Sequence, residues 1–448
     1  MSSTCNNYKS VADFYDGKSV FITGATGFLG KVLVEKLLFS CYGIDKIYIL
    51  TRAKNALTLD QRVEQLTDSP VFNRLKACRP EDLTKIYPVS GDLTAPGLGL
   101  SADDEDTLVQ KVSVVFHSAA TINFNKPLLV ALNTNLEGTR KVLELCKRMR
   151  NIRALVHVST AYSNTDKEVV EERVYPPPAE IDEVYKLVEK YGDAEKTTKL
   201  LLNGRPNTYC FTKALTEVYL AENYGDVPTV ILRPSIVTAA VNEPLVGWLG
   251  GWQGLTTILA MSARGFHRVI LCNGQLFPDL IPVDYVVNMA LVAAVNSKKN
   301  ELSVYNCCTS GVNPITYLIF VKIYSHYVFS DKLPFPGTRL TRSRIVLVVL
   351  TLLTQTLPAY VMDACRLAMR KRPKYVRLNR QLINLRNQVQ HFTSHNWVMK
   401  SANAQALAAS LSGADARQFQ CHPAHVRWSS YMPIYYMGVK KFLFGDKA

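Results

Sequence analysis

The fold of this chain is constrained most by one glycine-rich stretch, Thr23-Gly24-Ala25-Thr26-Gly27-Phe28-Leu29-Gly30. It follows a strand-like run at residues 19–22 and opens a helical pattern of apolar residues. Strand, glycine turn and helix in this order are typical of a dinucleotide-binding unit. Gly24 permits the tight turn, Gly27 lets the backbone approach a pyrophosphate, and Gly30 allows close packing of helix on strand. We therefore expect the N–H groups at the helix start to face phosphate.

Further along the chain, apolar runs alternate with helical patterns. The runs lie at residues 46–50, 86–90, 112–117, 154–159 and 229–232, and clear helical patterns at 133–149 and 213–224. Continuous apolar runs are typical of parallel strands that are buried on both faces. The sequence therefore predicts an α/β fold, a Rossmann-type doubly wound parallel sheet. A charged segment, 167–207, is interpreted as an insertion.

The pattern changes after about residue 250, and from residue 315 the chain is helical and apolar. We expect residues 14–310 to form an NAD(P)-binding domain with its substrate-binding part. Residues 315–445 should form a smaller, mainly helical C-terminal domain. The ten cysteines include no Cys-x-x-Cys pair and the N-terminus has no apolar signal core, which indicates free thiols, a reducing compartment and no secretory signal.

The formal net charge of +15 is concentrated in the last quarter of the chain. Residues 331–448 hold 18 basic and 4 acidic side chains, whereas residues 1–330 hold 34 and 33. An uncharged run, 345–362, precedes the basic cluster and reaches the lower length limit of a membrane-spanning helix. Either this region contacts a membrane with its basic side in the cytosol, or it is a buried helix beside a solvated charged face. No nucleic-acid-binding motif accompanies the charge, so no nucleic-acid partner is expected.

The second predicted strand ends at Arg52, about twenty residues beyond Gly30. An NAD-selective site usually has an acid here for the ribose hydroxyls, whereas a guanidinium suits a 2′-phosphate. We therefore expect NADPH. Further candidate cofactor contacts lie at the ends of the third and fourth strands and on the next helix: Asp92, Leu93, Ala119, Ala120, Thr121 and Asn135. His117, at the fourth strand end, is predicted to be structural.

Tyr209 and Lys213 lie four residues apart at the start of a predicted helix, so they share one face of it. A neighbouring ammonium should lower the pKa of the phenol, and tyrosine could then protonate a carbonyl oxygen as hydride arrives at carbon. The fifth strand ends at Ser159 and Thr160, and either hydroxyl could bond to the same oxygen. Histidine pairs at 391/395 and 422/425 lack a convincing third ligand, so no metal is expected.

These motifs together resemble the extended short-chain dehydrogenase/reductases, and more narrowly the alcohol-forming fatty acyl-CoA reductases. The narrower resemblance covers residues 14–445, nearly the whole chain. It rests on the glycine stretch continued by Lys31-Val32-Leu33, on Val158-Ser159-Thr160-Ala161-Tyr162, Tyr209-x-x-x-Lys213, Leu232-Arg233-Pro234-Ser235-Ile236-Val237, Gly247-Trp248 and Ile281-Pro282-Val283-Asp284, and on the C-terminal stretches 358–363, 428–431 and 436–443.

The resemblance implies that Tyr209 is the acid, Lys213 its activator and a ribose ligand, and Thr160, ahead of Ser159, the oxyanion donor. It places Pro234, Ser235 and Val237 beside the nicotinamide. The implied reaction has two steps. NADPH delivers hydride to the thioester of a long-chain fatty acyl-CoA, and the hemithioacetal collapses to an aldehyde and free CoA. A second NADPH then reduces the aldehyde to a primary alcohol.

The family works at endoplasmic reticulum or peroxisomal membranes, so we expect membrane association with the active site facing the cytosol. The apolar segments 315–329 and 345–362 could line an acyl groove, and the basic tail could bind the CoA phosphates. Two alternatives remain open: another extended reductase similar to 3β-hydroxysteroid dehydrogenases, and a catalytically silent nucleotide-binding scaffold.

Overall fold

The computed structural model describes residues 10–52, 57–124, 126–192, 195–330 and 338–445. Its centre is a seven-stranded sheet with the order β11-β7-β5-β4-β1-β2-β3, in which every pair of neighbours is parallel. The predicted Rossmann-type sheet is thereby confirmed. The strands are β1 (Ser19–Thr23), β2 (Ile47–Thr51), β3 (Ile86–Ser90), β4 (Val112–His117), β5 (Ala154–Val158), β7 (Thr229–Pro234) and β11 (Leu302–Cys307).

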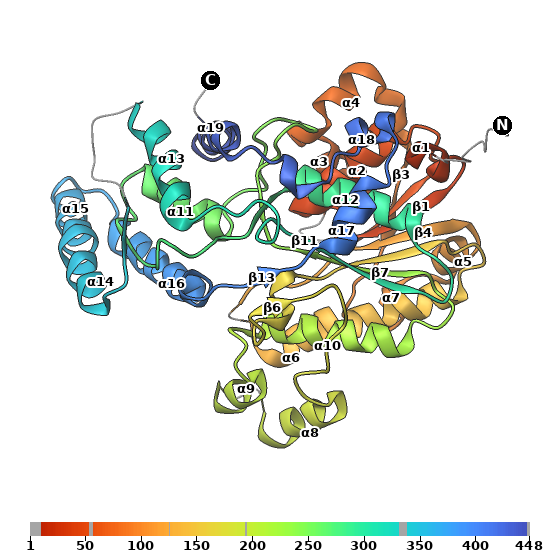
Figure 1. The fold of residues 1–448 in the computed structure, drawn as a ribbon, viewed down its shortest axis with the longest axis horizontal. Coiled ribbons are helices and arrows are strands. Elements are labelled where there is room, and N and C mark those ends of the chain that lie inside the picture. Colours follow the sequence, from red (N-terminus) through yellow and green to blue (C-terminus); the bar gives the residue numbers. More distant parts are fainter. Residues whose placement is uncertain (1–9, 53–56, 125, 193–194, 331–337, 446–448) are drawn as a thin grey trace, which may run out of the picture.

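Helices cover both faces of this sheet (Figure 1). On one face, Val20 and Ile22 of β1 pack with helices α2 (Phe28–Ser40) and α12 (Val283–Asn296). Phe21, between them in sequence, points to the other face and joins a core with α5 (Ala102–Lys111) and α7 (Glu137–Arg148). Successive side chains of a strand point to opposite faces, so a continuous apolar run fills both cores.

The shorter elements of the first 310 residues connect or extend this framework. Two helices, α8 (Ile181–Tyr191) and α9 (Glu195–Leu202), project from one end as the predicted insertion (Figure 1). The remaining elements are α1 (Val11–Tyr15), α3 (Leu59–Thr67), α4 (Asn73–Cys78), α6 (Leu128–Ala131), β6 (Val169–Val170), α10 (Thr208–Asn223), β8 (Ile236–Thr238), α11 (Gly254–Ala263), β9 (Val269–Leu271) and β10 (Leu280–Pro282).

The C-terminal region is mainly helical, as predicted. It shares a core with the sheet domain, because Tyr431 and Tyr435 belong to the same apolar cluster as β1 and α2. The Tyr431 hydroxyl donates a hydrogen bond to the carbonyl oxygen of Ala239 (2.7 Å). Its elements are α13 (Tyr317–Ser330), β12 (Arg339–Thr341), α14 (Arg344–Thr351), α15 (Leu357–Ala368), α16 (Tyr375–Ser394), β13 (Val398–Met399), α17 (Ala402–Ala409), α18 (Gly413–Gln418) and α19 (Trp428–Gly438).

The uncharged run 345–362 lies on the outside of the molecule. Helices α14 and α15 join through a π-helical turn, Leu352–Thr356, into one 25-residue helix, Arg344–Ala368. Only 22 % of its most apolar stretch is buried. The alternative of a buried helix beside a charged face is therefore wrong. Among the described residues, this is one helix that is long and apolar enough to cross a membrane.

Candidate active site

The glycine-rich turn connects β1 to α2 and has the geometry that its sequence predicts. Gly24 has a φ of +79°, and a Cβ there would lie 2.7 Å from the amide nitrogen of Ala119. A Cβ on Gly30 would lie 2.1 Å from the carbonyl oxygen of Gly24, so only glycine lets α2 pack against the turn. Thr26 and Gly27 are exposed, and Gly27 caps α2 without a side-chain bond. The turn thus forms an open cradle of backbone at a helix start, which fits a pyrophosphate.

Arg52 and Asp92 meet beside this cradle, at the ends of β2 and β3. The guanidinium lies 3.5 Å from a carboxylate oxygen of Asp92 and is 68 % exposed, so it is free to reach a ligand. Asp92 also accepts hydrogen bonds from the backbone and hydroxyl of Thr94, and these bonds together with Arg52 hold its pKa below the usual range despite partial burial. Leu93 is buried, and its carbonyl oxygen accepts a bond from Lys141 (3.0 Å).

Thr23 and His117 form a buried pair under the turn. The Thr23 hydroxyl lies 2.7 Å from Nδ1 of His117 and accepts a hydrogen bond from the amide of Ala119. Burial lowers the pKa of His117 to about 3, which agrees with the predicted structural role. Because the hydroxyl of Thr23 is buried and already bonded, this side chain supports the turn from below.

Asn135 has a similar supporting place, although the sequence suggested a cofactor contact. Its side chain is buried, with its oxygen accepting from the amide of Thr121 (2.9 Å) and its nitrogen donating to the hydroxyl of Thr212 (2.9 Å). The contact of Asn135 with a cofactor stays a prediction. Asn135 joins the strand end that carries Ala119, Ala120 and Thr121 to helix α10.

Helix α10 brings Tyr209 to the end of β5. Asn207 caps the helix by accepting a hydrogen bond from the amide of Cys210 (2.9 Å). The phenol of Tyr209 lies close to the Thr160 hydroxyl, which acts to lower the pKa of the phenol. Ser159, the other candidate, turns away and donates to the carboxylate of Glu217. Of the two hydroxyls at this strand end, Thr160 is therefore the one placed beside Tyr209.

Lys213 lies one turn further along α10 and is buried. Its Nζ donates a hydrogen bond to the carbonyl oxygen of Val158 (2.6 Å), and burial lowers its pKa to about 7, opposed in part by Glu217. The pKa of Tyr209 is raised, because burial outweighs the opposing influence of the nearby Thr160 hydroxyl. The lowered phenol pKa expected from the sequence is thus not found. A lysine that is itself desolvated carries too little charge to offset burial of the phenol.

Glu217 and Arg233 form an ion pair that the sequence analysis missed. The guanidinium of Arg233, on β7, donates to both carboxylate oxygens of Glu217 (2.6 and 3.0 Å), and both side chains are almost completely buried. The available signal was spacing, since Glu217 follows Lys213 by four residues on the same face of α10. The pair ties helix α10 to strand β7.

The other cofactor candidates lie where β7 passes into β8: Pro234 ends β7, Ser235 follows it, and Val237 belongs to β8. The Ser235 hydroxyl is buried without a hydrogen-bond partner, and Val237 is half-buried on β8. An unpaired buried hydroxyl is costly, which fits a site that a polar ligand completes. Cys210 is buried and its pKa is raised to about 12 by that burial, so its thiol is not an activated nucleophile.

An apolar cavity of about 180 Å³ begins beside Tyr209. Phe124 lines it and stacks on the Tyr209 ring at 6.1 Å between centroids. The cavity continues between α11, α13 and α16, along Ile258, Phe320, Tyr324, Val328, Leu340, Val389 and Phe392. Segment 315–329 therefore lines an apolar groove, as expected. The expectation that 345–362 also lines it is wrong, because this segment contributes no wall residue and faces outward.

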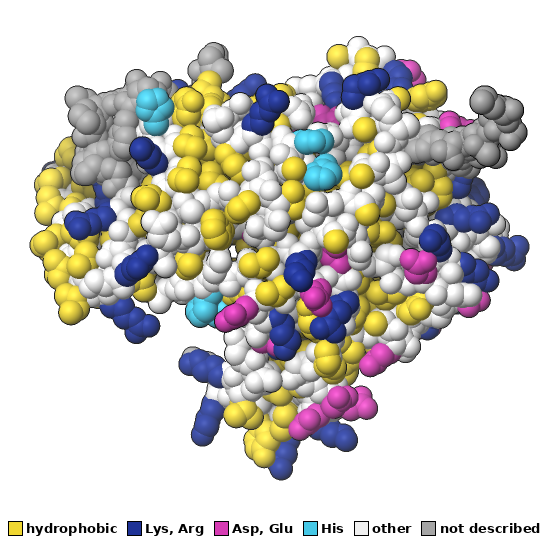
Figure 2. Space-filling model, in the orientation of Figure 1, with side chains coloured by type: hydrophobic (Ala, Val, Ile, Leu, Met, Phe, Trp, Pro, Cys, Tyr) yellow, Lys and Arg dark blue, Asp and Glu magenta, His cyan; other side chains and the backbone are white. Residues whose placement is uncertain are grey.

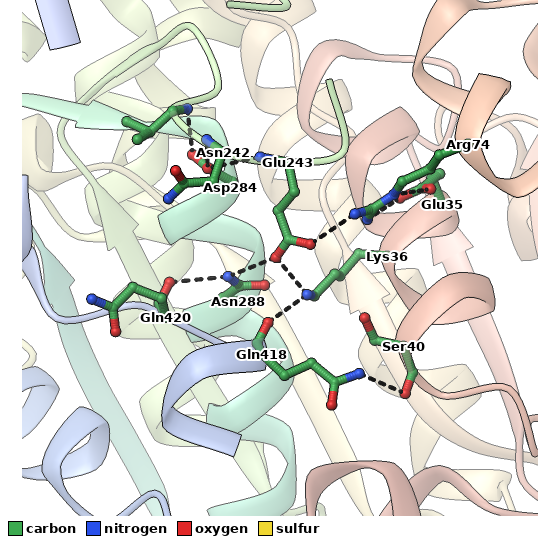
Figure 3. Close-up of polar contacts among 11 residues, drawn as sticks. Glu35, Lys36, Ser40, Arg74, Asn242, Glu243, Asp284, Asn288, Gln418 and Gln420 are labelled. Carbon is green, nitrogen blue, oxygen red and sulfur yellow. Dashed lines mark hydrogen bonds and ion pairs between the residues drawn. The ribbon is translucent and has the colours of Figure 1, made fainter. Parts of the chain in front are cut away.

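A second polar cluster fastens α2 to the C-terminal region (Figure 3). Lys36 of α2 bonds to the Glu243 carboxylate (2.5 Å) and the Gln418 carbonyl oxygen (2.6 Å). The carboxylate of Asp284 accepts backbone N–H bonds from residues 241–243, although burial raises its pKa to about 6. The loop after β8 is thus held by Lys36 through the Glu243 side chain and by Asp284 through the backbone. Among the described residues, no group of three or more His, Cys, Asp or Glu side chains could hold a metal ion.

Comparison with known families matches both halves of the chain. The model of an NAD-binding domain described as "Male sterility protein" matches residues 22–290, and a second model, Sterile, with the same description, matches residues 354–446. A protein named Fatty acyl-CoA reductase 1 from Xenopus laevis is 34 % identical over 98 % of this chain and 87 % of its own length. The chain belongs to the fatty acyl-CoA reductase family. The resemblance inferred from the sequence is thereby confirmed.

Other relatives agree with this membership. Human Fatty acyl-CoA reductase 1 is 32 % identical over the same shares of both chains. The crystal structure of the terminal R domain from the myxalamid PKS-NRPS biosynthetic pathway has a TM-score of 0.63 at 20 % identity, covering 96 % of this chain and 93 % of that one, which shows the fold. In this family the cradle at Gly24–Gly30 belongs to an NAD-binding domain, so the chain's cofactor is a nicotinamide dinucleotide.

Proposed function

We propose that this protein reduces long-chain fatty acyl-CoA to a primary fatty alcohol with NADPH, through an aldehyde. One observation carries the proposal: within a dinucleotide-binding fold, Tyr209 stacks on Phe124, and Phe124 lines an apolar cavity. A proton donor beside an apolar channel suits a carbonyl at the end of a hydrocarbon chain. Family membership supports the same substrate class.

The chain's own residues would act on the carbonyl oxygen. Tyr209 donates its phenolic proton to that oxygen in each reduction, and the Thr160 hydroxyl bonds to the same oxygen. The raised pKa of Tyr209 keeps the phenol protonated and ready to donate. Lys213 holds the ribose. Once its Nζ leaves the Val158 carbonyl oxygen, Lys213 also supplies positive charge beside the phenol. When bound, the dinucleotide supplies the hydride, held by the turn at Thr26–Gly30 and by Ser235.

NADPH is favoured over NADH by the exposed guanidinium of Arg52 at the end of β2. A 2′-phosphate there would receive charge-assisted hydrogen bonds. Asp92, 3.5 Å away, orients the guanidinium. The adenine amino group would remain within reach of the same carboxylate.

We further propose a membrane-associated enzyme whose active site faces the cytosol, at the endoplasmic reticulum or peroxisome. The outward apolar face of α14 and α15 and the basic residues after it support this location. We also propose that residues 14–310 form an NAD(P)-binding domain and residues 315–445 a helical C-terminal domain. The support is the change of sequence pattern after about residue 250 and the apolar helical pattern from residue 315.

The test is to incubate purified protein with NADPH and palmitoyl-CoA and to extract the lipids. Fatty alcohol, with about two NADPH oxidised per alcohol, supports the proposal. Oxidation of a sterol with NAD instead would favour an extended reductase of the 3β-hydroxysteroid dehydrogenase type. Cofactor binding without turnover of acyl-CoA or sterol would indicate a nucleotide-binding scaffold.

A further inference from the structure

Helices α14 and α15 are amphipathic, but their apolar side faces away from the protein. Their apolar residues recur every three or four positions on the exposed side: Ile345, Val348, Val349, Leu352, Leu353, Leu357, Tyr360 and Val361. The row that faces the protein includes Thr351, Gln355 and Asp363, all buried. Surface helices of soluble proteins turn their apolar stripe toward the core. The inward row of this helix also contains Leu347 and Ala359, so it mixes polar and apolar side chains, whereas the outward row is apolar.

Two hydroxyls on this helix are hydrogen-bonded to backbone carbonyl groups of the same helix and do not depend on water. Thr354, on the exposed side, donates to the carbonyl oxygen of Leu350 (2.7 Å), and Thr351 donates to that of Leu347 (2.6 Å). Between Ile345 and Leu357 the exposed side therefore presents one hydroxyl, that of Thr354, and the helix satisfies it; the hydroxyl of Tyr360 lies about one turn further on. Such a face is suited to hydrocarbon, where every polar group must find its partner inside the protein.

Helix α16 fixes the apolar helix to the rest of the molecule along most of its length. Arg386 of α16 donates to the Thr351 hydroxyl (2.7 Å), and Asn379 donates to Thr356 (3.1 Å). The carboxylate of Asp363 accepts the backbone N–H groups of residues 374–376, where α16 begins. The two helices are therefore one unit. The apolar helix cannot cross a bilayer without drawing the arginines of α16 into the hydrocarbon, which is costly.

From this arrangement we infer that α14 and α15 lie in the plane of one leaflet of an anionic bilayer, with the exposed apolar row in the acyl region. The helix neither spans the membrane nor packs in a protein core. This inference rests on the proposed membrane association and specifies its geometry. Amphipathic helices of this kind bury their apolar face about 5–10 Å below the headgroup boundary.

Charge identifies the partner as anionic lipid. The exposed basic residues at and beyond the helix ends are Arg342, Arg344, Arg370, Lys371, Arg372, Lys374, Arg377 and Arg380. No acidic residue occurs between Asp363, which is buried, and Asp415. Figure 2 shows the apolar patch at the left edge of the molecule with basic side chains around it. An apolar band with a cationic border matches the hydrocarbon and anionic headgroups of a leaflet.

A flotation experiment tests whether this face binds lipid. The full-length protein is mixed with phosphatidylcholine vesicles, with and without phosphatidylserine, and floated on a density gradient. We expect flotation that is stronger with phosphatidylserine and weakened by salt. The double variant Ile345→Gln/Val348→Gln should lose most of the flotation. The matched control Tyr191→Gln/Leu200→Gln, which removes two exposed apolar side chains from the insertion, should float as wild type does.

A depth measurement distinguishes the in-plane helix from a spanning one. Val348→Cys and Val361→Cys are made separately, with Cys5, Cys78 and Cys365 replaced by serine, and labelled with an environment-sensitive fluorophore. Quenching by lipids brominated at defined positions then reports the depth of each probe. The two sites are thirteen residues apart, about 20 Å along an α-helix. Equal, shallow depths support the inference, and a difference approaching 20 Å would overturn it.

The remaining outcomes separate this inference from the proposed function. Wild type that floats while neither probe contacts lipid would place the membrane contact elsewhere and overturn the inference alone. Wild type that does not float would overturn the membrane association and the inference together. Shallow, equal probes in a protein that forms no fatty alcohol would support the inference and contradict the reductase proposal.

Discussion

Arg233 and Glu217 form an ion pair (2.6 Å) between β7 and α10, with side chains 0 % and 1 % exposed. Arg233 also donates to the backbone carbonyl oxygens of Glu171 (3.0 Å) and Arg173 (2.8 Å). Glu217 accepts further hydrogen bonds from Ser159 and Ser163. One buried pair thus joins the catalytic helix, the end of β5 and the start of the insertion.

Removal of one member should be strongly destabilising. Glu217→Ala leaves the Arg233 guanidinium buried without its carboxylate, and we expect a loss of about 3–5 kcal/mol in the free energy of unfolding. Urea denaturation followed by circular dichroism measures it. The control is Asp226→Ala, which breaks an exposed pair with Lys299 and should unfold close to wild type. Equal stability of the two variants would contradict a structural role for the buried pair.

Stability should also depend on pH through Lys213. Its pKa is about 7 in the folded protein and near 10.5 in the unfolded chain. Between these values the unfolded chain holds a proton that the folded protein lacks, so raising the pH favours folding. From pH 7 to 9 the contribution should grow by about 2 kcal/mol and be absent from Lys213→Met. Lys299→Met, which removes an exposed lysine, is the control and should keep the wild-type pH profile of stability. If the pH profile of Lys213→Met also runs parallel to that of wild type, Lys213 is not desolvated as described.

Cofactor preference tests the role of Arg52. Arg52→Ala removes the charge-assisted bonds to a 2′-phosphate, so KM for NADPH should rise about 10- to 100-fold with little change for NADH. Initial rates with each dinucleotide provide the measurement. Arg150→Ala, an exposed arginine in the turn before β5, serves as the control. An equal rise in KM for both dinucleotides would show that Arg52 does not bind the 2′-phosphate.

Chain-length dependence tests the cavity. Ser325 on α13 lines the cavity, and Ser325→Phe fills part of it. We expect kcat/KM to fall with palmitoyl-CoA and to change much less with octanoyl-CoA, because only the longer chain needs the full channel. His326→Phe places the same phenyl ring at the next, exposed position and should leave both rates unchanged. A uniform loss with both substrates would mean that the acyl chain lies elsewhere.

Much of the framework could be predicted because it depends on local patterns. Six of the seven strands are short apolar runs, and Tyr209, Lys213 and Thr160 occur at spacings that the fold brings together. β11 escaped prediction because polar Ser303 and Asn306 interrupt its apolar run.

Other features depend on contacts between distant residues. The Glu217–Arg233 pair and the Phe124–Tyr209 stack join segments that no local spacing links. The direction in which 345–362 faces could not be predicted either. Its outward apolar face follows from α16, whose Arg386 and Asn379 occupy the polar row. The raised pKa of Tyr209 likewise reflects burial, which a Tyr-x-x-x-Lys spacing does not report.

The central claim is that Tyr209 protonates the acyl carbonyl oxygen. It is tested most directly by acyl-CoA-dependent NADPH oxidation and fatty alcohol formation in Tyr209→Phe, with NADPH binding measured by fluorescence in the same preparation. The account predicts a fall in kcat of at least about 100-fold with cofactor affinity unchanged. Fatty alcohol formation by Tyr209→Phe at the wild-type rate would contradict it.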